Sequence, residues 1–221
     1  MNTTSLGILG LGSRSTAFYL SELNRLYNKT HGGYSTCPLF LINTNFNSIN
    51  TLLPKPSTTL DLMVRQYLNT FETLNTTQLL IPNITLHETI DRLSISQNII
   101  HPIHLSISKI KQNQWPTIVL FGSLYSMQSE YLLKHFKANN IDVITPTPTD
   151  MERIDAIRTH IYNETETEAL LTSYHALIAK YSKDYPVVLA CTELSILKPK
   201  KNPRLLDMAQ VQIEAAINKM H

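Results

Sequence analysis

The feature that most constrains the fold of this chain is a long-period repeat in the order of its apolar and polar segments. A Gly-Ser turn follows the first apolar segment of each half, at Ser13 and Ser123, which are 123 − 13 = 110 residues apart. A polar turn after the third apolar segment of each half lies at Asn83 and Cys191, which are 191 − 83 = 108 residues apart. Similarity at such a long period indicates duplicated structural units. We therefore predict two α/β lobes with the same order of elements.

Short apolar runs bounded by glycine, proline or polar residues predict strands, and runs with apolar residues at helical spacing predict helices. Strands that alternate with helices are typical of doubly wound parallel sheets. We assign residues 1–104 and 205–221 to the first lobe and residues 105–204 to the second. The predicted strands are 6–11, 38–42, 78–81, 99–104, 117–121, 141–144 and 187–190. The predicted helices are one that follows Ser13, and then 60–74, 106–112, 127–136, 150–164, 166–181 and 209–220.

Composition and charge argue against several classes of protein. With 43% hydrophobic and 16% charged residues the chain is typical of a globular protein, and no run approaches the roughly 20 apolar residues of a membrane span. The segment Met1–Ser5 lacks the basic residues of a signal peptide. A net charge of +2, with one short basic run at 198–201, gives no indication of nucleic-acid binding. We therefore expect a cytoplasmic protein that binds neither nucleic acid nor membrane.

The cysteines and histidines form no metal-binding pattern. Cys37 and Cys191 are far apart in the sequence, with no Cys-x-x-Cys pair, and without an export signal we expect both to be reduced thiols. His101 and His104 are close in sequence, but no cluster of carboxylates accompanies them. We therefore expect no metal site.

The first turn resembles part of a dinucleotide-binding fingerprint. Gly10-Leu11-Gly12 matches its start, but Ser15 stands where the third glycine or alanine belongs. The next strand, 38–42, ends in Asn43 instead of the acidic residue that would hold a ribose. We therefore predict no nicotinamide cofactor and expect the turn, with Arg14 as its cation, to suit a small anion better.

Cys191 is the strongest candidate for a chemical role. It follows the apolar run 187–190 directly, and Thr192 and Glu193 come next. In a parallel sheet this position faces the ligand crevice, and the start of the following helix favours a thiolate. We predict that Cys191 is an acid/base group with a lowered pKa and that Glu193 either orients it or caps the helix; the alternative is a small buried residue.

Five segments, distributed over nearly the whole chain, share an order and spacing: 7–10 with Ser15 and Thr16, 82–87, 121–127, 190–194 and 206–207. Together they resemble the aspartate/glutamate racemase family. The most specific of them is Cys-Thr-Glu after an apolar strand. The resemblance implies two Rossmann-like lobes related by a pseudo-twofold axis, with the active site in the cleft between them. It also implies catalysis without pyridoxal phosphate or another cofactor, and a homodimer.

Racemisation requires removing a proton from one face of Cα and returning one to the other, which two acid/base groups can do. The family uses two cysteines, and the resemblance makes Cys191 the second of them. It further implies that the turns after the strands hold the substrate's carboxylate and ammonium groups. We name Cys191, Asn83, His87 and Glu193 as candidate catalytic residues, and Ser13, Arg14, Asn45, Asn47, Ile84, Thr85, Gly122, Ser123 and Thr192 as candidate substrate-binding residues.

The sequence departs from the family at the first cysteine, where Asn83 stands. An amide cannot act as a base near neutral pH, so His87, Thr85 or a bound water would have to complete the proton transfer. Three functions remain open. One is a cofactor-independent racemase or epimerase acting at Cα of an acidic or related amino acid. The others are a lyase or decarboxylase that uses Cys191 alone, and a protein that binds a small acid without catalysis.

Overall fold

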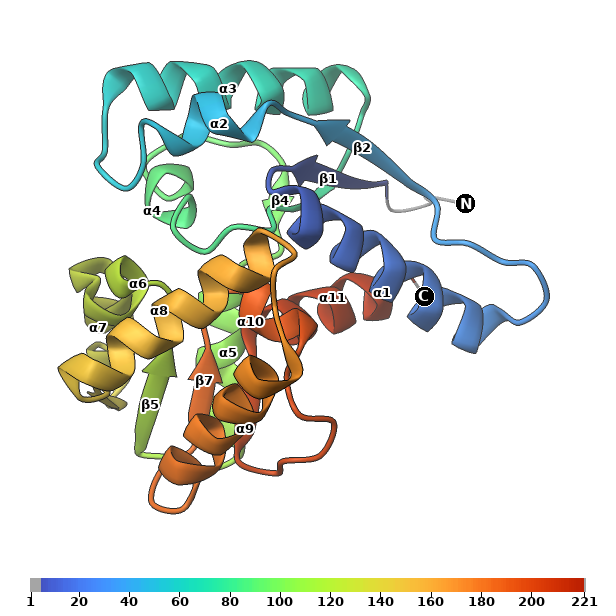
Figure 1. Cartoon of the computed structure of the whole chain (residues 1–221). Helices are drawn as coiled ribbons and strands as arrows, with labels where there is room; N and C mark the ends of the chain where they lie inside the picture. Colours follow the sequence, from blue (N-terminus) through green and yellow to red (C-terminus); the bar gives the residue numbers. More distant parts are fainter. Residues whose placement is uncertain (1–4, 221) are drawn as a thin grey trace. The chain divides into compact units, whose positions relative to one another are not determined.

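The computed structural model describes residues 5–220 and divides them into two compact units, each built around a four-stranded parallel sheet (Figure 1). Unit 1 comprises the described residues up to His101 and those from Gln212 onward, and unit 2 comprises Pro102–Val211. Helices separate the strands along the chain, so the predicted α/β class is confirmed. Residues 1–4, on which the expectation of no signal segment partly rests, and residue 221 lie outside the described part.

The two sheets have the same strand order, which confirms the predicted repeat of elements. The order is β2-β1-β3-β4 in unit 1 and β6-β5-β7-β8 in unit 2, and all the pairings are parallel. In each sheet the connections run in opposite directions from the first strand, and ligands of open α/β sheets bind beyond the carboxyl ends of the strands at such a switch point. The strands are β1 (Leu6–Gly10), β2 (Leu39–Asn43), β3 (Gln78–Leu80), β4 (Asn98–Ile99), β5 (Thr117–Phe121), β6 (Asp142–Ile144), β7 (Val187–Leu189) and β8 (Leu205–Asp207).

Hydroxyl side chains begin many of the helices, because an oxygen at the N-cap accepts a hydrogen bond from a free backbone N–H. Ser57, Ser123, Ser129, Thr147 and Thr167 do this for α3, α6, α7, α8 and α9. The helix predicted at 127–136 is therefore two helices. The helices are α1 (Ser13–His31), α2 (Phe46–Asn50), α3 (Thr58–Thr73), α4 (His87–Ile90), α5 (Pro102–Gln112), α6 (Leu124–Gln128), α7 (Glu130–Lys137), α8 (Pro148–Tyr162), α9 (Glu168–Ser182), α10 (Thr192–Ile196) and α11 (Met208–Asn218).

Two further predictions differ from the structure. The strand predicted at 99–104 is wrong beyond Ile99, because Pro102 opens α5, and proline is favoured in the first turn of a helix. No strand was predicted for Leu205–Asp207, and the segment 205–221 was assigned to the first lobe. Of this segment, Leu205–Asp207 instead forms β8, which pairs with β7 in the sheet of unit 2, and the chain enters unit 1 again at Gln212, within α11.

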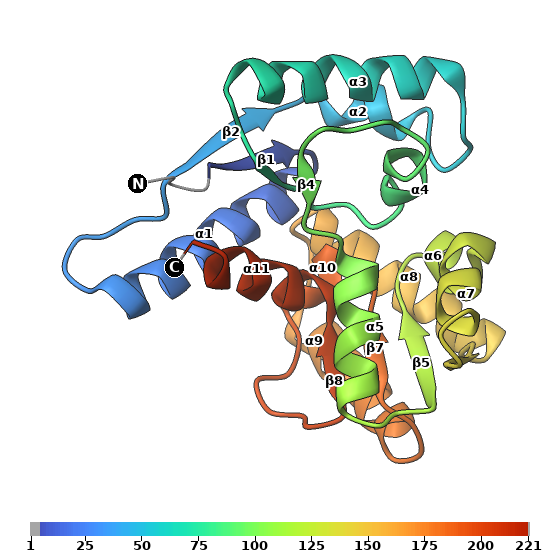
Figure 2. The same cartoon turned by 180° about the vertical axis from the view of Figure 1, so that it is seen from behind.

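Each unit has its own apolar core. In unit 1, Leu9 and Leu79 of the sheet pack with Phe71 of α3, and in unit 2, Phe121 and Leu189 pack with apolar residues of α8 and α9. In unit 1, α11 lies alongside α1 in both views (Figures 1 and 2). Residues 5–220 contain no helix that combines the length and the apolar character needed to cross a bilayer.

Both cysteines are free thiols, as predicted. Cys37 precedes β2 and is buried, and its burial raises the pKa of the thiol to about 11. Its sulfur contacts that of Met220 at 3.6 Å. A protonated thiol in an apolar site is chemically inert. Cys37 is therefore a core residue, and any thiol chemistry belongs to Cys191.

Candidate active site

The switch point of unit 2 brings the turn after β5 against the end of β7. The two strands pair up to Phe121 and Leu189, and the N–H of Ala190 then donates to the carbonyl of Phe121 at 2.7 Å. A Cβ added at Gly122 would lie 3.2 Å from the carbonyl oxygen of Ala190 and 2.9 Å from Cβ of Ser126. Glycine at position 122 thus permits close contact between the two turns, and Cys191 follows directly.

The Cys191 thiol donates a hydrogen bond to Oε2 of Glu193 at 3.0 Å. Burial and the neighbouring carboxylate of Glu193 raise the pKa of this thiol well above its usual value. The predicted lowered pKa is therefore wrong. The helix that Cys191 caps, α10, has only five residues, and the positive end of its dipole is outweighed by burial and by Glu193. Near neutral pH, the Cys191 thiol consequently keeps its proton.

Arg158 supplies a positive charge to this site from α8. Its Nε donates to Oδ1 of Asp155 at 2.9 Å, and the same oxygen accepts from the N–H of Leu124 at 3.2 Å. Burial opposes the guanidinium charge, but the hydrogen bond to Asp155 and the attraction of Cys191 and Glu193 raise its pKa above the usual value. A thiolate formed at Cys191 would therefore be stabilised by a nearby cation.

Sequence analysis missed Arg158. It follows Asp155 by three residues on a predicted helix, and such pairs are usually solvated surface ion pairs. Only the packing of α8 against α10 gives this one a position near Cys191. Arg14, the cation named from the sequence, does not belong to unit 2.

Ser123 and Thr192, which were predicted to bind substrate, both lie at helix starts in this unit. Ser123 caps α6: its Oγ accepts from the N–H of Ser126 at 3.1 Å and lies 2.9 Å from Oγ of Ser126. Thr192 is buried as the first residue of α10. Ser123 is half-buried, and its hydroxyl already caps α6. A substrate that bound this hydroxyl would have to form a hydrogen bond in addition to the one from Ser126.

A buried network fixes the backbone that carries Cys191. Ser195 Oγ lies 3.3 Å from the carbonyl oxygen of Cys191 and donates to Oδ1 of Asp207 at 2.7 Å. Asp207 ends β8 and is also bound by Lys198 and by the N–H of Ala209, the latter at 3.0 Å. These contacts join the start of α10 to β8, so they hold the thiol in one place.

The corresponding turn of unit 1 has different chemistry. Oδ1 of Asn83 accepts from the N–H of Leu86 at 2.9 Å, and the carbonyl of Asn83 accepts from Nδ1 of His87 at 2.8 Å. Because a carbonyl can only accept, Nδ1 carries the proton of the imidazole. Nε2 of His87 is buried without a hydrogen-bond partner among the described residues. Asn83 thus stabilises the turn, and Nε2 of His87 is a ring nitrogen that carries no proton.

His87 is a weak base. Its complete burial, and then the nearby His101 ring at 4.7 Å between centroids, lower its pKa to about 3. It is neutral near pH 7, and a group with so low a pKa takes up a proton poorly. Thr85, two residues earlier, is half-buried between Ile84 and Leu86.

The remaining predicted binding residues lie at the ends of β1 and β2 in unit 1. Ser13 is exposed and Arg14 half-buried in the first turn of α1. Asn45 caps α2 by accepting from the N–H of Asn47 at 3.2 Å, and both asparagines are exposed. Gly10 and Asn43 pair in register, so these two turns are neighbours. Their substrate contacts stay predictions.

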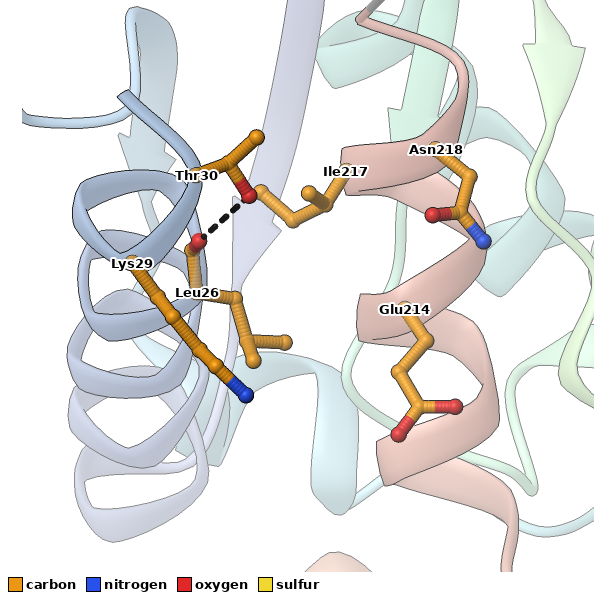
Figure 3. Close-up of a pocket in the computed structure, with 6 residues that line it drawn as sticks. All are labelled: Leu26, Lys29, Thr30, Glu214, Ile217 and Asn218. Atoms are coloured by element: carbon orange, nitrogen blue, oxygen red, sulfur yellow. Dashed lines mark hydrogen bonds between the residues drawn. The ribbon is translucent and has the colours of Figure 1, made fainter. Parts of the chain in front are cut away.

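A groove of about 400 Å³ lies elsewhere in unit 1, between α1 and α11 (Figure 3). Lys29 and Thr30 line it from the last turn of α1, whereas the predicted site residues Ser13 and Arg14 lie in the first turn of this 19-residue helix. The groove is therefore at the opposite end of α1 from the candidate residues. Its full lining is Leu26, Lys29, Thr30, Glu214, Ile217 and Asn218.

Comparison with known proteins identifies the architecture. No protein-family model and no curated protein matches the sequence. A proposed Asp/Glu racemase from Yersinia pestis superposes with a TM-score of 0.83 at 21% identity, over 98% of this chain and 99% of that one. This chain has the racemase fold. An aspartate racemase homologue from Pyrococcus horikoshii gives a TM-score of 0.83 at 16% identity, over 98% and 99% of the two chains. The aspartate racemase of Picrophilus torridus gives 0.80 at 15% identity, over 98% and 94%.

These structures confirm the racemase fold that the resemblance implied, and their similarity extends over both units. Identities of 15–21% show the fold alone. Activity, substrate and site residues of this chain therefore have to be argued from its own side chains.

Proposed function

We propose that the chain is a cofactor-independent isomerase of the racemase type, acting at Cα of an acidic or related amino acid with Cys191 as the proton donor. The observation that supports this most is the protonated Cys191 thiol at the switch point of unit 2, hydrogen-bonded to Glu193 and close to Arg158. The racemase fold of the whole chain supports the same reaction class.

The donating step follows from these three side chains. A carbanion at Cα, with its charge spread into the α-carboxylate, takes the proton of the Cys191 thiol. The S–H bond breaks, a Cα–H bond forms, and the sulfur keeps the electron pair as a thiolate. Arg158 stabilises the negative charge, which lowers the barrier for the transfer. The thiolate then regains a proton.

The removal of the proton from Cα is the slower of the two steps in the proposed reaction. Asn83 has no basic atom near neutral pH, and the pKa of His87 is about 3. We assign the abstraction to a water molecule, with Thr85 as a hydroxyl that orients it. Such a base is less effective than a thiolate, so we expect slow abstraction and rapid donation.

Incubation in D₂O tests the proposal. Acidic and neutral amino acids of both configurations are incubated with the protein, and deuterium at Cα is measured by NMR together with optical rotation. We expect incorporation that Cys191→Ser reduces by about 10²-fold or more, the scale of general acid–base catalysis. Cys37→Ser is the matched control, since Cys37 is the other free thiol and lies in unit 1. Folded protein that introduces no deuterium into any of these amino acids would contradict the proposal.

The same observation favours a second candidate, a decarboxylase of malonate-type acids. Loss of CO₂ by cleavage of a C–C bond leaves a carbanion without any base, and the Cys191 thiol then protonates it. Asn83 would not impair this reaction. CO₂ release from a substituted malonate, abolished by Cys191→Ser, would select the lyase; ligand-dependent stabilisation without turnover would indicate a binding protein.

The resemblance extends to three further expectations, which we propose for this chain. The racemases it resembles work without pyridoxal phosphate, so we expect activity to survive hydroxylamine, which destroys the cofactor's aldehyde. We also propose a cytoplasmic location and a homodimer.

A further inference from the structure

Two histidines on neighbouring helices of unit 2 lie close together. His104 is on α5 and His135 is on α7, and these two helices pack against each other. The centroids of the two rings are 5.5 Å apart, and a nitrogen of one ring lies within 4.8 Å of a nitrogen of the other. His104 is exposed and His135 is half-buried, so a solute can reach both rings.

This pair is not the one that the sequence suggested. His101 and His104 are close in sequence, but His101 belongs to unit 1 and packs against the ring of His87, whereas His104 belongs to unit 2. His104 and His135 are 135 − 104 = 31 residues apart, and they come together because α5 packs against α7. Sequence spacing therefore could not indicate this pair.

Further contacts hold the two rings in position. Tyr131, one turn earlier on α7, packs edge-to-face against His135 with 4.7 Å between the ring centroids. Nζ of Lys111 on α5 donates to Oδ1 of Asn139 at 2.7 Å, and Nδ2 of Asn139 donates to the carbonyl of His135 at 2.9 Å. The end of α7 is thus tied to α5 beside the residue that carries one of the rings. Side chains that are already held in place lose less conformational entropy when they bind an ion.

We propose that His104 and His135 form a binding site for a divalent transition-metal ion, such as zinc or copper. These ions bind imidazole nitrogen well, whereas magnesium and calcium prefer oxygen ligands. Two nitrogens bound to a tetrahedral zinc ion, each at about 2.0–2.1 Å, lie about 3.4 Å apart. The two ring nitrogens lie within 4.8 Å, and rotation of the exposed His104 side chain closes the remaining gap. Water or further ligands complete the coordination.

An ion held by both rings cross-links α5 to α7. Because it needs the two helices in their folded positions, it should stabilise the folded protein and raise the temperature of unfolding. None of the residues that we propose for proton transfer is a ligand of this ion. The metal site would therefore be present whether the chain is a racemase, a lyase or a binding protein.

Calorimetric titration of the full chain with zinc chloride tests the site. We expect one zinc ion per chain and weaker binding in His104→Gln and in His135→Gln, each of which leaves a single imidazole. Loss of an outer partner of a metal ligand already costs about 10- to 100-fold in affinity, so loss of a ligand should cost at least as much. His160→Gln is the matched control, because His160 is an exposed histidine of the same unit, and it should bind zinc like the wild type.

Thiols also bind zinc, so Cys191→Ser is titrated in parallel and should keep the affinity of the wild type. A wild type that binds no zinc overturns the proposal, as do folded histidine variants with undiminished affinity. If a variant folds poorly, the wild type with substoichiometric copper(II) decides by NMR. The imidazole signals of His104 and His135 must then broaden before those of the other histidines, and earlier broadening elsewhere overturns the proposal.

Discussion

The turns after β3 and β7 occupy the same position in two sheets of identical strand order, yet their chemistry differs. After β7, the Cys191 thiol donates a hydrogen bond to Glu193, and the charge of Arg158 favours its thiolate form. After β3, Asn83 uses its amide to hold the turn, and His87 is buried and neutral. The same strand order therefore places different side chains at two equivalent turns, and of the two turns only the one after β7 carries a thiol.

The largest change in the rate of Cα deuterium exchange is expected when the turn after β3, like the turn after β7, carries a cysteine. Asn83→Cys restores a second thiol at the position of the family's first cysteine, and we expect Cα deuterium exchange to rise by about 10²- to 10⁴-fold, the usual gain from a positioned acid/base group. The measurement is initial exchange rate by NMR. Because the amide of Asn83 also accepts from Leu86, Asn83→Ser serves as the control for loss of that hydrogen bond. Equal rates in Asn83→Cys and Asn83→Ser, both folded, would contradict the assignment of this turn.

Removal of the cation should affect only the turn of unit 2. Arg158→Met keeps much of the apolar length but leaves the thiolate without a nearby positive charge, so we expect turnover to fall by roughly 10²-fold. Steady-state kinetics with the best substrate found in D₂O provides the measurement. Arg153→Met, on the same helix, is the matched control, because its guanidinium pairs with Asp150. A comparable loss in the control would show that the effect comes from α8 in general.

Stability at acid pH should reveal the buried histidine of unit 1. The pKa of His87 is about 3 in the folded protein and about 6.5 when unfolded, so the unfolded chain binds the proton first as pH falls. The neutral ring's contribution is fully present above about pH 6.5 and is lost between about 6.5 and 3, at up to about 1.4 kcal/mol per pH unit. At pH 5 we expect a loss of about 2 kcal/mol relative to pH 7.

His87→Gln should remove this part of the pH dependence. The measurement is urea unfolding of both proteins at pH 7 and pH 5, compared by the change between the two pH values, which cancels any pH-independent cost of the substitution. His160→Gln is the control, because His160 is exposed. Identical changes in the wild type and His87→Gln would show that His87 is not the buried neutral group.

The smallest effect concerns the protonation of Cys191. Glu193→Gln removes the negative charge that helps to raise the pKa of the thiol, so that pKa should fall and more thiolate should form at pH 8. We expect alkylation by iodoacetamide to accelerate by about tenfold for each pKa unit recovered. Measuring in a Cys37→Ser background leaves a single thiol. An unchanged rate would mean that burial alone sets this pKa.

Much of the fold was predictable from local patterns. Apolar runs located β1, β2, β3, β5, β6 and β7 to within about two residues, because strands of parallel α/β sheets are rich in apolar residues. β8 was missed, since Leu205–Asp207 offers only two apolar residues and its pairing with β7 is a long-range contact. The strand predicted up to His104 failed because Pro102 could be interpreted either as the end of a strand or as the start of a helix.

The positions of the candidate residues along the chain were predictable, but the protonation states of Cys191 and His87 were not. The sequence by itself determined the repeat of elements and the turns that follow the strands, including the chemical types at Asn83 and Cys191. The packing of distant segments placed Arg158 near the thiol, left Cys191 only partly exposed and buried His87 completely. Strand and turn patterns depend on residues close in the sequence, whereas a pKa depends on burial and on distances to charges, which packing of distant segments decides.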